Sequence, residues 1–238
     1  MLVAAAPTSA DLAGLLRRRL SGQPLEHVVG FAEFCGLRIS VGPGVFVPRR
    51  RTEFLVHEAA KVISPRDVVV DLCCGSGAVG AALLSLACEF TLHAVDIDVR
   101  AVEWARRNVA GRGQVHQGDL YHPLPIALRG QVKVIVGNAP YVPSAAIELM
   151  PREARLYEPL AALDGGEDGL DVQRRVVAGA RQWLAPDGYL LVETSERQAP
   201  STAELFAHGR LSPRIQRSED LDATVVIGRL APSPGVTV

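Results

Sequence analysis

The chain has 238 residues, of which 48% are hydrophobic and 21% are charged. These values are ordinary for a soluble globular protein and exclude a disordered chain. The length predicts one domain with an elaboration. With 25 basic and 26 acidic residues, the chain lacks the basic surface of proteins that hold duplex nucleic acid by its phosphates, so no direct nucleic-acid readout is expected.

The cysteines and the apolar runs favour a cytoplasmic protein with reduced thiols. The four cysteines form no C-x-x-C pair, and no histidine lies at zinc-finger spacing from them. So few cysteines in a chain of this length also argue against a disulfide scaffold. No apolar run approaches the about 18 residues of a membrane span, and residues 1–11 lack the basic lead of a signal peptide. We therefore expect no metal and no membrane contact.

The first 52 residues are predicted to form an N-terminal arm. Residues 8–20 have leucines on one helical face and Ser9 as a plausible N-cap. Alternating apolar positions on either side of Gly36 predict a hairpin. Prolines then break the pattern, and a helix follows with Thr52 as its expected cap. We place the catalytic domain at residues 53–238.

From residue 67 onward, segments typical of strands and helices alternate. This order predicts an α/β fold, a doubly wound and mostly parallel sheet with helices on both faces. The last two strands are separated only by a short acidic turn, which predicts an antiparallel hairpin at the sheet edge. Strands are expected at 67–74, 90–97, 114–119, 131–140, 188–194, 213–218 and 223–230, and helices at 75–87, 98–110, 168–184 and 201–208.

Three polar or glycine-rich segments follow successive predicted strands, where ligands of such sheets bind. The first contains Asp71 and the glycines of a G-x-G-x-x-G pattern, Gly75, Gly77 and Gly80. The second is Asp96, whose carboxylate is placed to accept hydrogen bonds from ribose hydroxyls. In the third, Asp119 is expected to accept from an adenine amino group, with Leu120 and Tyr121 walling the ring.

The glycine pattern alone would also fit NAD. Asp71, however, precedes the glycines, where it would repel a pyrophosphate but suit an ammonium group. S-adenosylmethionine carries an ammonium, a sulfonium and no phosphate, so we favour it over NAD. A glycine turn without a ligand is the remaining alternative.

The strand over 131–137 leads into Asn138-Ala139-Pro140-Tyr141. The Asn138 side-chain oxygen and the Ala139 backbone oxygen are each able to accept one N–H from a planar nitrogen, which localises the lone pair toward a methyl donor. Tyr141 would pack on the planar group. Such catalysis consists of positioning and electrostatics and requires no strong base. The tetrapeptide alone is also compatible with an Asx-type turn before a proline.

The run of motifs from residue 23 to the end resembles the protein-glutamine N5-methyltransferases that modify peptide release factors. The matching segments are QPLEHVVGFAEFCGLRISVGPGVFVPRRRTEFLV, DLCCGSG, AVDID, GDLY, GNAPY, YEPLAALDGGEDGL and LLVETSERQ. The resemblance implies a class I methyltransferase that uses S-adenosylmethionine and methylates the glutamine of a Gly-Gly-Gln tip. It further implies that Asn138 to Tyr141 hold the glutamine, and that the cofactor is contacted by Cys73, Cys74, Gly75, Ser76, Gly77, Asp96, Leu120 and Asn138.

The chain departs from that family's pattern in three places. The family's loop is Asn-Pro-Pro-Tyr, and Ala139 stands at the second position. Cys73 and Cys74 stand where the family usually has glycine and a small residue, and we interpret them as packing residues, not nucleophiles. The helical N-terminal region is also shorter. In the family the PR-x-x-TE segment lies close to the active site, so Arg49 and Glu53 are expected to order the loop over the substrate, with a solvated turn as the alternative.

Two other functions compete with glutamine methylation. A nucleic-acid N6-adenine methyltransferase uses a similar loop, although the near-neutral charge argues against it. A cofactor-binding partner protein with weakened catalysis would explain Ala139 and the short N-terminus. The presence of Asn138, Pro140 and Tyr141 argues against that second alternative.

Overall fold

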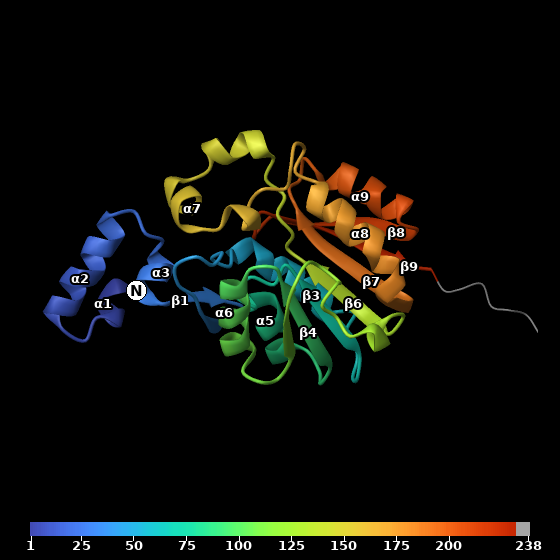
Figure 1. Ribbon diagram of the computed structural model, residues 1–238, viewed down its shortest axis with the longest axis horizontal. Coiled ribbons are helices and arrows are strands. Elements are labelled where there is room, and N and C mark those ends of the chain that lie inside the picture. The colour runs from blue at the N-terminus through green and yellow to red at the C-terminus, as the bar shows by residue number, and fades with distance from the viewer. Residues whose placement is uncertain (232–238) are drawn as a thin grey trace, which may run out of the picture.

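The computed structural model describes residues 1–231. Its centre is a seven-stranded sheet with helices on both faces, and a small helical arm extends from one end (Figure 1). The strand order is β5-β4-β3-β6-β7-β9-β8. The bounds are β3 Val68–Leu72, β4 Thr91–Asp96, β5 Gln114–Gln117, β6 Val132–Gly137, β7 Leu184–Thr194, β8 Leu211–Ser218 and β9 Ala223–Leu230.

This topology confirms the predicted doubly wound fold. Strands β3 to β7 are parallel, and β9 runs antiparallel between β7 and β8. The predicted closing hairpin therefore exists, with its second strand inserted beside β7. The strand order reverses between β3 and β6, and ligands of open α/β sheets bind at the carboxyl ends of the strands beside such a reversal.

The two faces of the sheet carry separate hydrophobic clusters. Helices α4 (Glu53–Ala60), α5 (Ala78–Leu86) and α6 (Val99–Val109) contribute to one cluster, and α8 (Asp171–Trp183) and α9 (Ala199–His208) contribute to the other. Alternate residues of the buried strands point to opposite faces. In β7, Leu191 belongs to the α4 side and Leu190 to the α8 side. Burial on both faces explains why these strands are apolar throughout.

The N-terminal arm contains α1 (Leu2–Ala5), α2 (Ser9–Leu20), α3 (Leu25–Val29) and the hairpin of β1 (Phe31–Phe34) and β2 (Leu37–Ser40). In Figure 1, α1 and α2 stand away from the sheet. The hairpin packs against the core, because Phe34 and Ile39 belong to the cluster on the α4 side. A domain boundary at residue 52 therefore stays a prediction.

Several predicted helix ends shift by a few residues. The cap of α2 is Thr8, whose hydroxyl oxygen accepts from the Asp11 N–H at 3.2 Å, and not Ser9. Residues 50–52 form a 3-10 turn, and α4 then begins at Glu53. Thr52 precedes that helix as predicted but makes no side-chain capping bond. Its hydroxyl instead accepts from Asn138.

Residues 144–162 form short helices that the sequence pattern did not predict. They comprise 3-10 turns at Ser144–Leu149 and Leu160–Ala162 and helix α7 (Arg152–Tyr157). This segment, yellow in Figure 1, lies above the end of the sheet on the side of the arm. Arg19 bonds to Glu153 at 2.9 Å, and the Tyr157 hydroxyl donates to the Ser21 carbonyl at 3.0 Å. These contacts join it to α2 and the turn after it. Within residues 1–231, no helix is long and apolar enough to cross a membrane.

Candidate active site

A cavity of about 660 Å³ opens at the carboxyl ends of β3, β4 and β6. The segment above the sheet, residues 144–162, covers part of it through Met150 and residues 159–162. Most residues singled out from the sequence meet here, although they come from the ends of four strands, β3, β4, β5 and β6. They are Asp71, Cys73, Cys74, Gly75, Ser76, Asp96, Asp119, Leu120, Asn138, Ala139, Pro140 and Tyr141.

Gly77 and Tyr121, which are predicted from the sequence to contact the cofactor, do not line this cavity. Gly77 begins α5 with φ +75°, and a Cβ there would lie 2.9 Å from the Ala105 Cα, so this glycine permits close packing of α5 on α6. Leu120 has φ +47°, which turns the chain so that Tyr121 points into the core. The Tyr121 hydroxyl donates to the Val176 carbonyl at 2.8 Å and its ring stacks on Trp183, which places it away from any ring in the cavity.

Asp71 and Asp96 hold the glycine loop through backbone N–H groups. One Asp71 oxygen accepts from Gly80 at 3.0 Å. The two Asp96 oxygens accept from Gly75 at 2.8 Å and from Asp98 at 2.9 Å. Each carboxylate oxygen has a second lone pair, so both acids fix the loop and still have acceptor capacity toward the cavity.

The negative charge of Asp71 and Asp96, on the side of the cavity formed by the glycine loop, has little positive charge beside it. Asp71 is only 1% exposed, and its burial raises its pKa to about 7, further raised by Asp96 and partly lowered by the Gly80 hydrogen bond. Burial also raises the pKa of Asp96, against its backbone hydrogen bonds. A buried and a partly buried acid, both hydrogen-bonded only to backbone N–H groups, fit a cationic ligand better than a phosphate. This is the charge pattern that S-adenosylmethionine requires.

Cys73 occupies a backbone conformation that favours glycine. Its φ is +54°, in the left-handed region, which costs a residue with a side chain about 1–2 kcal/mol. Burial raises the pKa of both the Cys73 and the Cys74 thiols. These thiols stay protonated at neutral pH, which agrees with packing rather than nucleophilic roles.

The side chains of the Asn138–Tyr141 loop are held from the α4 side of the sheet. The Asn138 Nδ2 donates to the Thr52 Oγ1 at 3.2 Å. The Tyr141 hydroxyl donates to the Glu193 Oε1 at 3.1 Å, and the Arg51 Nε lies 3.4 Å from the same oxygen. This loop, which we call the reactive loop, is therefore anchored by Thr52 and Glu193.

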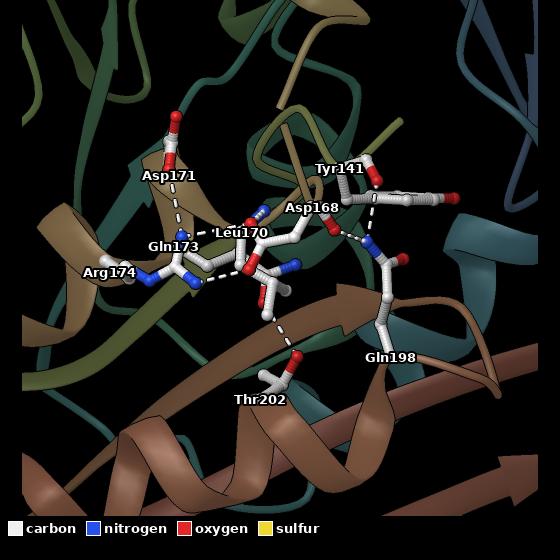
Figure 2. Close-up of polar contacts among 8 residues, drawn as sticks. All are labelled: Tyr141, Asp168, Leu170, Asp171, Gln173, Arg174, Gln198 and Thr202. Atoms are coloured by element: carbon white, nitrogen blue, oxygen red, sulfur yellow. Dashed lines mark hydrogen bonds and ion pairs between the residues drawn. The ribbon is translucent and has the colours of Figure 1, made fainter. Parts of the chain in front are cut away.

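The backbone of the reactive loop is held from the other side. Figure 2 shows Gln198, at the start of α9, reaching the carbonyl oxygens of Tyr141 and Asp168. Its Nε2 donates to them at 2.9 and 3.0 Å. The Ser195 hydroxyl donates to the Gln198 Oε1 at 2.6 Å, which fixes the orientation of the carboxamide. Gln198 thus joins the reactive loop to the loop that precedes α8.

Arg49 and Arg51 of the PRRRTE segment are paired with buried acids. Arg49 donates from Nη2 to both Glu158 oxygens, at 2.8 and 2.6 Å, and lines the cavity. Glu158 also accepts from the Val47 N–H at 3.2 Å. Glu53, however, accepts from the Cys35 N–H at 2.9 Å and so fixes the β1–β2 turn. The expectation that Glu53 orders the loop over the substrate does not match this geometry, whereas Arg49 is well placed.

Sequence reasoning missed several residues of this site. Thr52, Glu158, Glu193 and Gln198 anchor it, and Arg175 pairs with Asp119 at the cavity wall. For Glu193 a signal existed, because an acid at the end of the apolar run 190–192 falls at the ligand-binding edge of the sheet.

Comparison with known proteins assigns the family. A family model described as "Methyltransferase small domain" matches residues 36–154. A release factor glutamine methyltransferase of Streptomyces coelicolor is 40% identical over 201 residues, covering 82% of this chain and 71% of that protein. The protein of the same name from Mycolicibacterium smegmatis is 42% identical and covers 82% and 69%. This chain belongs to the release factor glutamine methyltransferase family.

Solved structures share the fold of this methyltransferase at low identity. A methyltransferase from Pyrococcus furiosus superimposes with a TM-score of 0.63 at 16% identity, covering 94% of this chain and 100% of that one. A ribosomal protein L11 methylase from Lactobacillus delbrueckii subsp. bulgaricus gives 0.58 at 15% identity, covering 81% and 85%. These structures confirm the fold alone. The cofactor follows from the family, and S-adenosylmethionine also suits the acidic half of the cavity.

The raised pKa of Asp71 predicts a pH-dependent cost to stability. Its folded pKa of about 7 exceeds its unfolded value of about 3.9, so stability falls as pH rises between them. We expect Asp71→Asn to raise the free energy of unfolding near pH 8 by on the order of 1–3 kcal/mol, with no gain near pH 4. Urea unfolding without cofactor at both pH values measures this. If Asp71→Asn changed the free energy of unfolding equally at both pH values, the raised pKa of Asp71 would be contradicted.

Asp96 is expected to dominate cofactor affinity. Asp96→Ala would remove the two charge-assisted hydrogen bonds expected to the ribose, each worth roughly 1.5–3 kcal/mol, and it frees the Gly75 N–H. Calorimetry with S-adenosylhomocysteine should show binding weakened by about a hundredfold or more. Asp96→Asn keeps an acceptor for the Gly75 N–H and should lose less affinity for S-adenosylhomocysteine than Asp96→Ala. Unchanged affinity in Asp96→Ala would refute the placement, and NAD should not bind the wild-type protein.

Proposed function

We propose that this methyltransferase transfers a methyl group from S-adenosylmethionine to the side-chain amide nitrogen of a glutamine in a peptide chain release factor. The observation that carries this proposal is the orientation of Asn138 at the cavity. Its Nδ2 is engaged by Thr52, so its Oδ1 is available to accept an N–H from a substrate amide. The release factor as substrate is supported by the names of relatives 33–42% identical to this chain.

The reactive loop has the chemistry that amide methylation requires. An amide nitrogen is a weak nucleophile because its lone pair is delocalised into the carbonyl. In the proposal, the Asn138 Oδ1 and the Ala139 carbonyl each accept one N–H, which fixes the nitrogen and favours localisation of its lone pair. The Tyr141 ring, held by Glu193, packs on the amide plane. When bound, S-adenosylmethionine supplies an electrophilic methyl group on a sulfonium.

The proposed cofactor contacts follow the strand ends. Asp71 and the loop 73–76 would lie by the methionyl part, where the buried negative charge suits an ammonium group. Asp96 would accept from the ribose hydroxyls, and Leu120 would pack against the adenine. Asp119, held by Arg175, would accept from the adenine amino group. The proposal places the enzyme in the cytoplasm, where peptide chains are released.

Neither alternative function gains support from the comparisons. The relatives that match most of this chain bear the name of a release factor glutamine methyltransferase, and none of those named here is a nucleic-acid enzyme. The contacts of Asn138 and Tyr141 also show an ordered reactive loop, which a partner protein without catalysis does not need.

Asn138→Ala is expected to abolish turnover and leave the fold intact. Methyl transfer from labelled donor to a release factor that contains Gly-Gly-Gln should fall by about a thousandfold, since the loss removes a direct contact to the reacting nitrogen. A release factor with glutamate in place of that glutamine is the substrate control, and mass mapping locates the methyl group. If Asn138→Ala keeps turnover within about twofold of wild type, the proposed role of the reactive loop is wrong.

Ala139→Pro tests whether position 139 supplies only its backbone oxygen. Proline keeps that oxygen and removes an N–H, so activity on the release factor should hold or rise. Proline should also reduce the conformational entropy of the unfolded state. This raises the free energy of unfolding by about 0.4–1 kcal/mol if the φ of residue 139 already lies near −65°. Steady-state rates and urea unfolding of both proteins measure these effects. A fall in activity would show that the reaction uses the Ala139 N–H or the space beside it.

A further inference from the structure

The parallel pairing of β6 and β7 brings Asn138 beside Glu193. Gly137 lies opposite Val192, so the next residue of each strand continues the same register. Alternation along the strands sends both side chains to the α4 side, because Val136 and Leu191 belong to the cluster on that side. Thr52, immediately before α4, lies over them and bonds to Asn138.

These three side chains lie together as a polar chain, with Asn138 at the cavity and the other two shielded from water. Thr52 is 2% exposed and Glu193 is 1% exposed. Oε1 of Glu193 accepts from the Tyr141 hydroxyl, and its Oε2 is buried and accepts no hydrogen bond from residues 1–231. Burial raises the pKa of Glu193, while the Thr52 hydroxyl, Arg51 and Tyr141 favour its ionised form. The strand register and the position of Thr52 before α4 place the Glu193 carboxylate on the side of the sheet where Thr52 lies. The Oε2 of Glu193 is an acceptor toward which the Thr52 hydroxyl can direct its proton.

The chemistry of the three groups gives this chain one direction. An ionised carboxylate accepts hydrogen bonds only, whereas a hydroxyl has a single proton to donate. If Thr52 donates toward Glu193, its oxygen is left to accept from Asn138. Asn138 must then turn its Nδ2 toward Thr52 and its Oδ1 toward the cavity. The opposite orientation would set the Asn138 NH₂ against a substrate NH₂, two donors with no acceptor between them.

We propose that Glu193 and Thr52 are positioning residues that fix the orientation of the Asn138 carboxamide, so that its oxygen faces the substrate nitrogen. Glu193 at the same time fixes the Tyr141 ring through the phenol hydroxyl. One buried acid thus orients both side chains of the reactive loop. This assignment rests on the proposed function, because it gives the Asn138 oxygen a substrate N–H to accept.

The experiment replaces each link of the chain and measures kcat on the release factor separately from affinity for S-adenosylhomocysteine. We expect Thr52→Val and Glu193→Gln each to lower kcat by about tenfold or more and to leave that affinity within about twofold. Thr52→Ser keeps the hydroxyl and should restore kcat to within about twofold of wild type. Because the two residues act in series, the double variant Thr52→Val/Glu193→Gln should lose no more than the worse single variant.

Thr202→Val is the matched control. The Thr202 hydroxyl is fully buried and donates to the Gln173 Oε1 at 2.8 Å on the α8 and α9 face of the sheet (Figure 2). The same chemical change there should lower stability and leave kcat within about twofold of wild type. The positioning role is overturned if Thr52→Val, like the control, leaves kcat unchanged. It is also overturned if the kcat losses of Thr52→Val and Glu193→Gln multiply in the double variant.

A second measurement needs no activity. In protein with ¹⁵N-labelled asparagine, the side-chain NH₂ signals of Asn138 are assigned by their loss in Asn138→Asp. One of the two protons should exchange with water slowly in wild type and Thr52→Ser, and about tenfold faster in Thr52→Val. Equal exchange rates in wild type and Thr52→Val would overturn the assignment. Wild-type protein that shows this protection but does not methylate a release factor would refute the proposed function alone.

Discussion

Burying negative charge around one cavity is the constraint on which the other parts of this site depend. Asp71, Asp96, Glu158 and Glu193 are largely shielded from water, and burial raises the pKa of each. Glu158 and Glu193 are paired with Arg49 and Arg51, whereas Asp71 and Asp96 accept only backbone N–H groups. The acids near the reactive loop are therefore neutralised by arginines of the protein, whereas the acids near the glycine loop keep their negative charge. In the proposed function, a cationic methyl donor would supply the missing positive charge on binding.

The segment 49–52 contacts three separate parts of the site. Arg49 reaches the segment above the cavity, Arg51 reaches the end of β7, and Thr52 reaches the reactive loop. Arg49 precedes the 3-10 turn in an extended conformation, and Arg51 and Thr52 lie in the turn, where each successive side chain rotates by about a third of a turn. The three side chains therefore point in different directions. One short piece of chain thus connects the cover, the sheet and the reacting group.

The fold could be predicted from periodicity, and the strand ends could be predicted as ligand sites, because both depend on neighbours in sequence. The position of Tyr121 after a strand end predicts that it walls the adenine ring with Leu120, but the left-handed backbone at Leu120 precedes a Tyr121 side chain that packs in the core. Residues 144–162 lack the amphipathic repeat that marks longer helices. The pairings of Glu158 and Glu193 with arginines about a hundred or more positions away depend on the tertiary fold, which no local pattern encodes.

The late position of Glu193 in the chain has a consequence for the order in which the parts of the site are synthesised. A chain that ends before β7 would contain the glycine loop and all four residues of the reactive loop, yet lack the partners of the Tyr141 hydroxyl and carbonyl. Parallel strands also pair only after long loops close, which makes their assembly slow. During synthesis, the glycine loop and the reactive loop therefore emerge before Glu193 and Gln198, the residues that hold Tyr141.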